Sequence, residues 1–360
     1  MKVGILTYHR ADNHGAVLQA YALQKYVYEK GVDCEIIDYC NPVIENLRKN
    51  NSYKDLIKSM VSGKRIKATR RKFDDFRARL LNTSRYVYNR ESIGRSNDLY
   101  DCFISGSDQV WNYRGNGFDK TYFLDFVKNI YKRNSYAASF GFEEIPQNYK
   151  QEYTKLLSNY NQISVREQQG YKIINSLLNK GVNVNIDPTL LLDKKKWKTL
   201  IGQPLVKERY IIIYSFGMTD EMYQTACRIS AEKKLKPIML TNSIRPYKKL
   251  IKAIGIGPFE FLNLFYYSEL VLTNSFHGLA FAINFNKEFY VETTSELNKS
   301  VKSRICDLLE LLQISERIIQ NSTQLSEINY CNVNKLLEIE RKKSDEYLNK
   351  LFKDPKLKGV

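Results

Sequence analysis

The segment Thr273–Gly278, with the sequence TNSFHG, is the clearest candidate for chemistry in this 360-residue chain. It follows the apolar run 269–273 and precedes a second apolar run, 279–283. This order predicts a buried strand, a tight turn and a helix that begins at the N-cap residue Ser275. His277 then lies in the first helical turn, where unpaired backbone N–H groups and the helix dipole favour an anion. Such an imidazole suits acid–base chemistry on an anionic substrate; alternatively, the turn only caps the helix.

A second candidate is the segment Gly106–Asn112, which follows the predicted strand 101–105. Asp108 could orient a sugar hydroxyl or act as a base, and Trp111 could stack on the apolar face of a sugar. In the alternative interpretation the segment is a structural turn, and Trp111 belongs to the hydrophobic core.

Two arginines are candidate anion-binding residues. Arg166 ends the predicted strand 162–166, and its planar guanidinium suits a carboxylate or phosphate bound through two hydrogen bonds. The alternative is a salt bridge to Glu167 or Asp187. Arg304 is a second candidate, for which the alternative is an ion pair on a helix surface.

The elements that must position these residues alternate between strand and helix. Residues 2–7, 16–30 and 32–39 predict a strand, a helix and a strand, which is the start of a doubly wound α/β domain. Ligands of such folds bind at the carboxyl ends of strands, so the polar loop 8–15, with Asn13 and His14, is a candidate site wall.

A second alternation begins at residue 210, after the polar segment 193–208, which is typical of a linker. The sequence therefore predicts two α/β domains, residues 1–195 and 205–325, that face each other across a cleft. Residues 326–360 are expected to form a C-terminal helix and a basic tail that pack back on them.

The chain is strongly basic, with a formal net charge of +17, which favours polyanionic partners. Residues 54–90 contain twelve Lys and Arg against three Asp, with Phe73, Phe76 and Leu80 as an apolar stripe. This segment is either a surface helix with a solvated basic face or a docking site for an anionic bilayer or a lipid-linked diphosphate.

Several classes of site have no support in the sequence. The six cysteines are scattered, and neither a C-x-x-C pair, an H-E-x-x-H motif nor a clustered carboxylate set occurs, so no metal site is expected. A G-x-G-x-x-G loop and a P-loop are also absent, and no cofactor is expected. No signal-peptide pattern or apolar run of about 18 residues is found, so we expect a cytoplasmic enzyme, in peripheral contact with the inner face of the membrane if residues 54–90 dock there.

Six segments in this order resemble the polysaccharide pyruvyl transferase family, over roughly residues 1–320. They are 13–23 (NHGAVLQAYAL), 106–112 (GSDQVWN), 164–167 (SVRE), 187–190 (DPTL), 273–278 (TNSFHG) and 303–305 (SRI). The resemblance implies a fold similar to GT-B glycosyltransferases, with the active site between two Rossmann-like domains. It also implies phosphoenolpyruvate as donor, a pair of sugar hydroxyls as acceptor, a donor-binding arginine at Arg166 and a catalytic histidine at His277.

The expected function is thus formation of a pyruvate ketal on a cell-surface polysaccharide or its lipid-linked precursor. The candidate residues are His277 and Asp108 for catalysis, Arg166, Ser275, Gly278 and Arg304 for the donor, and Asn13, His14 and Trp111 for the acceptor. Two alternatives stay open: a GT-B glycosyltransferase that uses a nucleotide sugar, and, more distantly, a basic nucleic-acid-binding protein. The latter lacks a recognition module, so no specific nucleic acid is expected.

Overall fold

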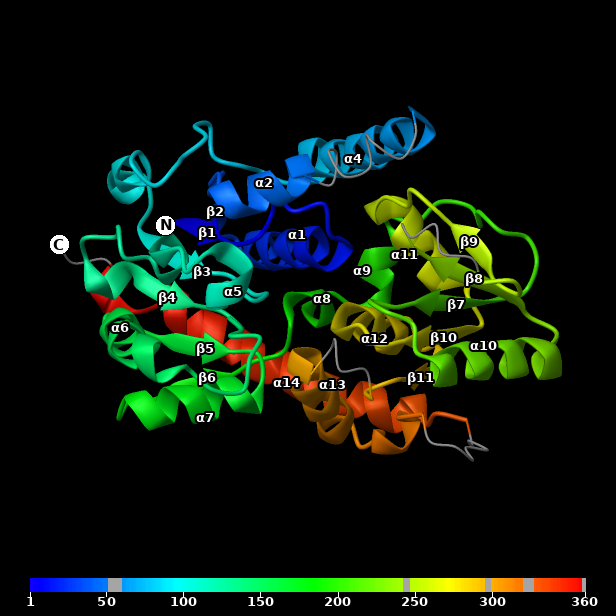
Figure 1. The fold of residues 1–360 in the computed structure, drawn as a ribbon. Coiled ribbons are helices and arrows are strands. Elements are labelled where there is room, and N and C mark those ends of the chain that lie inside the picture. The colour runs from blue at the N-terminus through cyan, green and yellow to red at the C-terminus, as the bar shows by residue number, and fades with distance from the viewer. Residues whose placement is uncertain (51–59, 242–246, 295–298, 320–326, 358–360) are drawn as a thin grey trace. The chain divides into compact units, whose positions relative to one another are not determined.

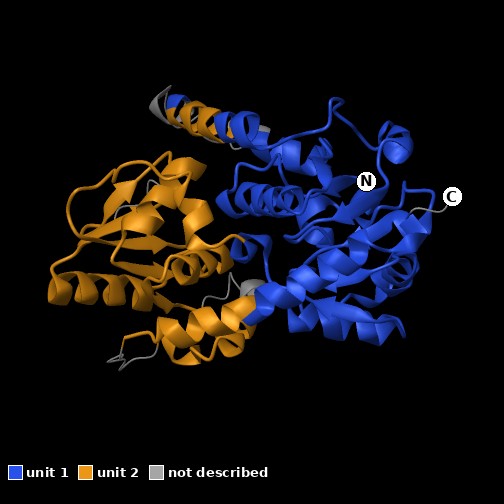
Figure 2. Ribbon diagram, turned by 180° about the vertical axis from the view of Figure 1, so that it is seen from behind, with its two compact units in different colours: residues 1–64, 74–191, 339–360 blue, residues 65–73, 192–338 orange. Residues whose placement is uncertain are grey.

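The structure, a computed structural model, describes residues 1–50, 60–241, 247–294, 299–319 and 327–357, which form two compact units (Figures 1 and 2). Unit 1 comprises residues 1–64, 74–191 and 339–360, and unit 2 comprises residues 65–73 and 192–338. The main passage of the chain from unit 1 to unit 2 therefore lies at 191–192, beside the polar segment expected to be a linker. The C-terminal helix is divided between the units.

Unit 1 contains a parallel sheet with the strand order β2-β1-β3-β4. Its strands are β1 (Lys2–Leu6), β2 (Asp33–Ile36), β3 (Cys102–Ser105) and β4 (Arg133–Ser135). Two further parallel strands, β5 (Ile163–Val165) and β6 (Val182–Val184), pair with each other. The bridges 134–162 and 138–165 join β5 to the segment of β4, so the parallel layer continues beyond β4.

The helices of unit 1 connect these strands and include part of the C-terminal helix. They are α1 (His14–Glu29), α2 (Pro42–Asn50), α5 (Tyr113–Asn116), α6 (Gln147–Ser158), α7 (Gln168–Leu177), α8 (Pro188–Leu191) and parts of α4 (Met60–Leu80) and α14 (Tyr330–Phe352). Between β3 and α6 the chain adds many buried aromatic side chains to the core.

Unit 2 contains a parallel sheet with the order β11-β10-β7-β8-β9. Its strands are β7 (Tyr210–Tyr214), β8 (Lys236–Leu240), β9 (Ile251–Ala253), β10 (Leu270–Thr273) and β11 (Glu288–Val291). Its helices are α9 (Lys194–Lys198), α10 (Asp220–Lys233), α11 (Pro258–Tyr267), α12 (Phe276–Asn284) and α13 (Lys299–Leu311), with parts of α4 and α14. Figure 1 shows α10 and α11 on opposite sides of this sheet.

Two elements of unit 2 differ from the prediction. Strand β9 was not predicted, because its three residues are flanked by polar sequence. The expected linker contains the short helix α9, in which Trp197 is fully buried and its ring lies 5.1 Å from that of Phe281. An indole in a polar segment was the available signal for this packing.

In both sheets, successive strands are first added on one side of the first strand and then on its other side. In unit 1 the chain runs from β1 to β2 on one side and then crosses to β3 on the other; in unit 2 it runs from β7 through β8 to β9 and then crosses to β10. Parallel strands linked in this way form doubly wound sheets, which confirms the α/β fold class. Over the described part of the chain, no helix combines the length and the hydropathy that crossing a bilayer requires.

Candidate functional site

Topology alone selects one edge of each sheet as a ligand site. In doubly wound sheets, ligands bind beyond the carboxyl ends of the two strands between which the strand order reverses. These strands are β1 and β3 in unit 1, and β7 and β10 in unit 2. The loops after these strands begin at residues 7 and 106 in unit 1 and at residues 215 and 274 in unit 2. Three of these four loops, all but the one at residue 215, were named as candidate sites from the sequence.

In unit 2, the turn after β10 begins helix α12 as expected. The Ser275 side chain accepts a hydrogen bond from Gly278 N at 3.4 Å, which is the N-cap interaction. The Thr273 hydroxyl donates to the carbonyl oxygen of Tyr214 at 2.6 Å and accepts from Ser275 N at 3.0 Å. These bonds hold the start of α12 against strand β7.

Gly278 is required by packing. A Cβ atom at this position would lie 2.3 Å from the Thr273 hydroxyl oxygen and 3.1 Å from the Tyr214 ring. The absence of a side chain therefore lets α12 approach both strands closely, which is a structural reason for a residue expected to contact the donor.

His277 occupies the first turn of α12, but it is only 9% exposed. Its imidazole packs edge-on against Phe276, with ring centroids 5.4 Å apart. A substitution at His277 must therefore preserve the volume of the side chain if it is to report on chemistry.

Arg304 lies on α13 and is 4% exposed. Arg304 is therefore not on the exposed surface of the helix, where the alternative interpretation placed it. Its expected contact with a donor remains a prediction.

Two residues at this edge of unit 2 were missed in the sequence. Asn274 is 1% exposed and joins three strand ends: its amide donates to the carbonyl of Gly217 (3.0 Å) and to Glu292 (3.1 Å), and its Oδ1 accepts from the N–H of Phe216 (2.9 Å). Glu292, also 1% exposed, follows β11 and accepts from the Thr294 N–H and hydroxyl. A polar residue directly after each buried strand was the signal that pointed to Asn274 and Glu292.

In unit 1, the turn after β3 places Asp108 at the carboxyl edge of the sheet. Asp108 has a φ of 75°, in the region that only glycine adopts freely, and its carboxylate accepts from the N–H of Gln109 at 2.8 Å. The turn thus holds a partly buried carboxylate in a strained conformation, which suits a functional residue but also a structural turn.

Trp111 is fully buried, and this placement argues against the expected stacking on a sugar. Its ring stacks on Phe123 at 5.8 Å and also contacts Phe140 and Tyr160. These three aromatic residues surround the indole, so the alternative interpretation, a core residue, describes the structure.

Arg166 takes part in a buried ionic cluster at the end of β5. Its guanidinium lies 2.9 Å from a carboxylate oxygen of Asp187 and 3.5 Å from one of Glu167, and the arginine side chain is 1% exposed. Both salt bridges named as the alternative to donor binding are therefore present. Burial disfavours the charged guanidinium, but the charges of Asp187, Glu167 and Asp108 outweigh this effect and raise the pKa of Arg166.

Hydroxyl groups complete this cluster. Asp187 accepts hydrogen bonds from Ser107 (2.9 Å) and Thr189 (2.7 Å), and Glu167 accepts one from Ser139 (2.7 Å). The cluster thus ties the turn after β3 to the ends of β5 and β6. In this conformation the arginine already has two carboxylate partners, so its contact with a third from a donor remains a prediction.

Asn13 and His14 begin helix α1, at the end of the loop after β1. Asn13 is exposed and caps the helix, since its side chain accepts from Ala16 N at 3.1 Å, and His14 is half-buried. Neither role excludes contact with an acceptor, which remains a prediction.

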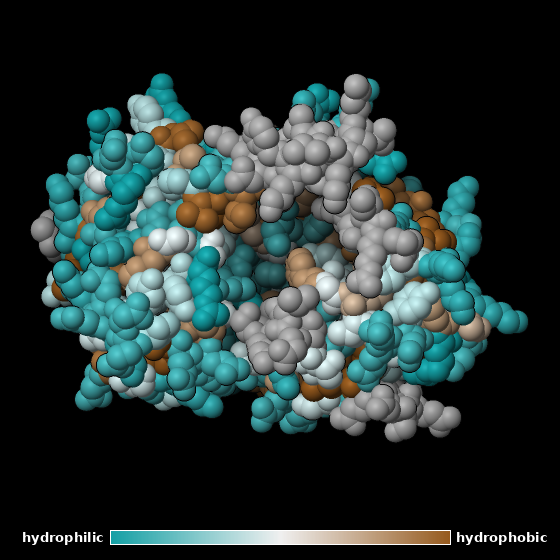
Figure 3. All heavy atoms as spheres, in the orientation of Figure 1, coloured by the Kyte–Doolittle hydropathy of each residue, from teal (hydrophilic) through white to brown (hydrophobic). Residues whose placement is uncertain are grey.

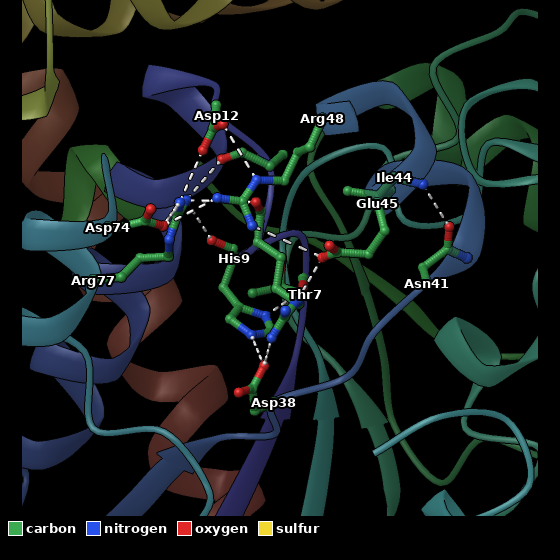
Figure 4. A network of polar contacts seen from close by, with 12 residues as sticks. Thr7, His9, Asp12, Asp38, Asn41, Ile44, Glu45, Arg48, Asp74 and Arg77 are labelled. Carbon is green, nitrogen blue, oxygen red and sulfur yellow. Dashed lines mark hydrogen bonds and ion pairs between the residues drawn. The ribbon is translucent and has the colours of Figure 1, made fainter. Parts of the chain in front are cut away.

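A polar network, shown in Figure 4, fixes the loop between β1 and Asn13. His9 is 2% exposed, and its Nε2 lies 2.9 Å from Asp38. Arg10 donates to Asp38 (2.7 Å) and to Glu45 (2.6 Å). Burial disfavours the carboxylate of Asp38, but the hydrogen bonds from His9 and Arg10 outweigh it and hold the pKa of Asp38 below its usual range.

In the same loop, Asp12 forms salt bridges with two arginines, one from α2 and one from α4 (Figure 4). Arg48 lies 3.2 Å and Arg77 2.8 Å from its carboxylate, and both also contact Asp74. Arg77 further donates to the backbone carbonyls of residues 9, 10 and 11, at 3.2–3.5 Å. This network was not predicted, because it joins residues up to about 70 positions apart in the chain.

The basic segment 54–90 is described only from residue 60 onward. Phe73 and Phe76 are 1% and 0% exposed, so the apolar stripe of α4 faces the protein, and the start of this segment lies outside the described residues. Among the described residues, no group of three or more His, Cys, Asp or Glu side chains could hold a metal ion.

Comparison with solved structures identifies the type of fold. UDP-GlcNAc 2-epimerase from Methanocaldococcus jannaschii is similar over 95% of this chain and 93% of its own, with a TM-score of 0.50 and 13% identity. A putative enzyme of the same name from Listeria monocytogenes matches over 98% and 97%, with a TM-score of 0.50 and 9% identity. The enzyme from Neisseria meningitidis bound to UDP-GlcNAc matches over 98% and 100%, with a TM-score of 0.50 and 11% identity. These similarities confirm a fold of the GT-B type.

Sequence comparisons are more specific. The search of curated proteins finds no match. The profile of the family described as "Polysaccharide pyruvyl transferase" matches residues 13–296, which include the turn with His277, the segment after β3 and Arg166. The chain therefore belongs to the polysaccharide pyruvyl transferase family.

Proposed function

We propose that this protein transfers a pyruvyl group from phosphoenolpyruvate to two hydroxyls of one sugar and forms a cyclic ketal. The observation that carries the proposal is the position of His277 in the first turn of α12, beside the strands where the order of the sheet reverses, in a chain of this family. A helix N-terminus binds phosphate and carboxylate well, and phosphoenolpyruvate carries both.

In the proposed mechanism the N-terminus of α12, with Ser275 and Gly278, holds the phosphate of the donor. Protonated His277 gives its proton to the methylene carbon C3, and positive charge develops at C2. One sugar hydroxyl attacks C2, the bond from C2 to the phosphate oxygen breaks, and the second hydroxyl closes the ring. Of the two protons that the hydroxyls release, one restores the imidazolium and the other leaves with the phosphate.

Further roles in unit 1 are proposed for residues at the carboxyl edge of its sheet. Asn13 and His14 would bind acceptor hydroxyls, and Asp108 would take up the hydroxyl proton that then leaves with the phosphate. Arg166 would bind the anionic donor through its positive charge, and Arg304 of unit 2 would do the same. The acceptor would be a cell-surface glycan or its lipid-linked precursor, reached through the basic segment 54–90.

The test is release of phosphate from phosphoenolpyruvate in the presence of a panel of lipid-linked and nucleotide-linked sugars. Mass spectrometry of the product should show addition of a pyruvate ketal, and omission of the sugar should abolish phosphate release. Transfer of a sugar from a nucleotide sugar, without consumption of phosphoenolpyruvate, would instead establish the glycosyltransferase alternative.

A further inference from the structure

Phe216 has an unusual position for a large apolar residue. It follows strand β7 at the edge of unit 2 where the strand order reverses, and it is 47% exposed. The neighbouring residues of this edge, Tyr214 and all of 270–285, are buried. Single exposed apolar residues are common on proteins, so exposure alone decides nothing.

The backbone around Phe216 is held in a defined conformation. Asn274 binds both the N–H of Phe216 (2.9 Å) and the carbonyl of Gly217 (3.0 Å), and Gly217 has a φ of 97°, which favours glycine. The Phe216 ring contacts Tyr214 edge-on, with centroids 5.4 Å apart. Asn274 directly precedes the N-cap of α12, so one side chain fixes the Phe216 turn relative to the His277 turn.

A second observation at this place concerns Ser215. Its hydroxyl oxygen is buried and has no hydrogen-bond partner within the described part of the chain. Buried polar groups nearly always have partners, and one that lacks them requires an explanation. A bound ligand rich in hydroxyls, beside the Phe216 ring, would supply a partner.

We propose that Phe216 is a substrate-contact residue on which the apolar C–H face of the acceptor sugar packs. A sugar needs both an apolar surface for one face and polar groups for its hydroxyls, and Phe216 and Ser215 offer these on adjacent residues. Trp111, from which this contact was expected, is buried in the core of unit 1. The inference rests on the proposed pyruvyl transfer for the identity of the ligand as its acceptor.

The kinetic test compares Phe216→Leu and Phe216→Tyr with Tyr28→Leu, a control that removes an aromatic side chain that is 66% exposed on α1. With an acceptor that supports phosphate release, Phe216→Leu should raise the acceptor KM roughly three- to tenfold, the range expected for an aromatic contact. The KM for phosphoenolpyruvate and kcat should stay constant, and Phe216→Tyr and the control should behave as wild type. An unchanged acceptor KM, or a change confined to the KM for phosphoenolpyruvate, would overturn the inference.

A binding experiment separates this inference from the proposed function, because it needs no turnover. Saturation-transfer NMR would measure binding of the methyl β-pyranosides of galactose and glucose and the methyl α-pyranoside of mannose to wild type, Phe216→Leu and the control. Loss of transfer to the C–H protons in Phe216→Leu alone supports the contact even if phosphoenolpyruvate is not consumed. Equal transfer in wild type and Phe216→Leu, or none to any of the three glycosides in wild type, overturns it.

Discussion

At the scale of single residues, His277 decides whether the proposed chemistry holds. Because the imidazole is buried against Phe276, His277→Gln is a better test than a truncation that leaves a cavity. Loss of a general acid typically lowers the rate about 10²- to 10⁴-fold, so we expect kcat to fall by this amount with little change in the thermal midpoint. Turnover close to that of the wild type, measured as phosphate release, would remove His277 from the mechanism.

A substitution at Arg166 tests whether this residue binds the donor or stabilises the fold through its salt bridges. Arg166→Ala leaves two buried carboxylates, Glu167 and Asp187, without their cation, and breaking a buried pair costs about 3–5 kcal/mol. We therefore expect a large loss in the free energy of unfolding, measured by chemical denaturation.

The matched control for this prediction is Arg209→Ala, which removes an exposed arginine that binds both oxygens of Glu269. Solvent screens that pair, so its loss should change stability far less. If Arg166→Ala unfolds like the wild type but binds phosphoenolpyruvate poorly, Arg166 is a donor ligand and the structural role is wrong.

At the scale of elements, Arg77 connects helix α4 to the loop that carries Asn13. Arg77→Ala removes hydrogen bonds to three backbone carbonyls and to Asp12, so we expect a loss of about 1–3 kcal/mol in stability and faster proteolysis of the loop 8–13. Arg79→Ala, two residues further along the same helix, is the control because Arg79 is 64% exposed and pairs with Asp75. Equal proteolysis of the two variants would show that the network does not order the loop.

Sequence patterns predicted these elements well where local periodicity determines them. Strand β10 lies within the predicted run 269–273, and helix α12 begins directly after the predicted N-cap Ser275, because an apolar run forms the strand and a serine caps the helix. The fold class and the TNSFHG turn followed from the same signals.

Contacts between distant segments were beyond the sequence. Nothing local to Trp111 shows that Phe123, Phe140 and Tyr160 surround it, and nothing local to Phe216 shows that Asn274 holds its turn. Arg166 was predicted only in part: the sequence suggested Glu167 or Asp187 as a salt-bridge partner, but only the tertiary structure shows that both form salt bridges with it. The candidate site could thus be located from the sequence, while the division into ligand contacts and core residues could not.

At the scale of the whole molecule, the net charge of +17 is concentrated in part on α4. Since Phe73 and Phe76 are buried, the apolar stripe is not available to a membrane, and we expect the described part of α4 to make electrostatic contact with it. Lys64, Arg65, Lys67 and Arg71 are exposed along the helix. The coloured residues on the face of the molecule drawn in Figure 3 are mostly hydrophilic, with scattered apolar residues between them. A basic residue near an anionic surface contributes about 1 kcal/mol, and salt screens this attraction.

We therefore expect the protein to sediment with liposomes that contain phosphatidylglycerol, to lose this binding as salt is raised, and to ignore neutral phosphatidylcholine liposomes. The double variant Lys64→Glu and Lys67→Glu should weaken the binding to anionic liposomes. The same charge change at Lys150 and Lys172, which are exposed on α6 and α7, should weaken it less if α4 is the contact. Equal loss in both double variants would show that only the net charge matters. Binding that is insensitive to lipid charge and salt would contradict electrostatic docking, without affecting the assignment of His277.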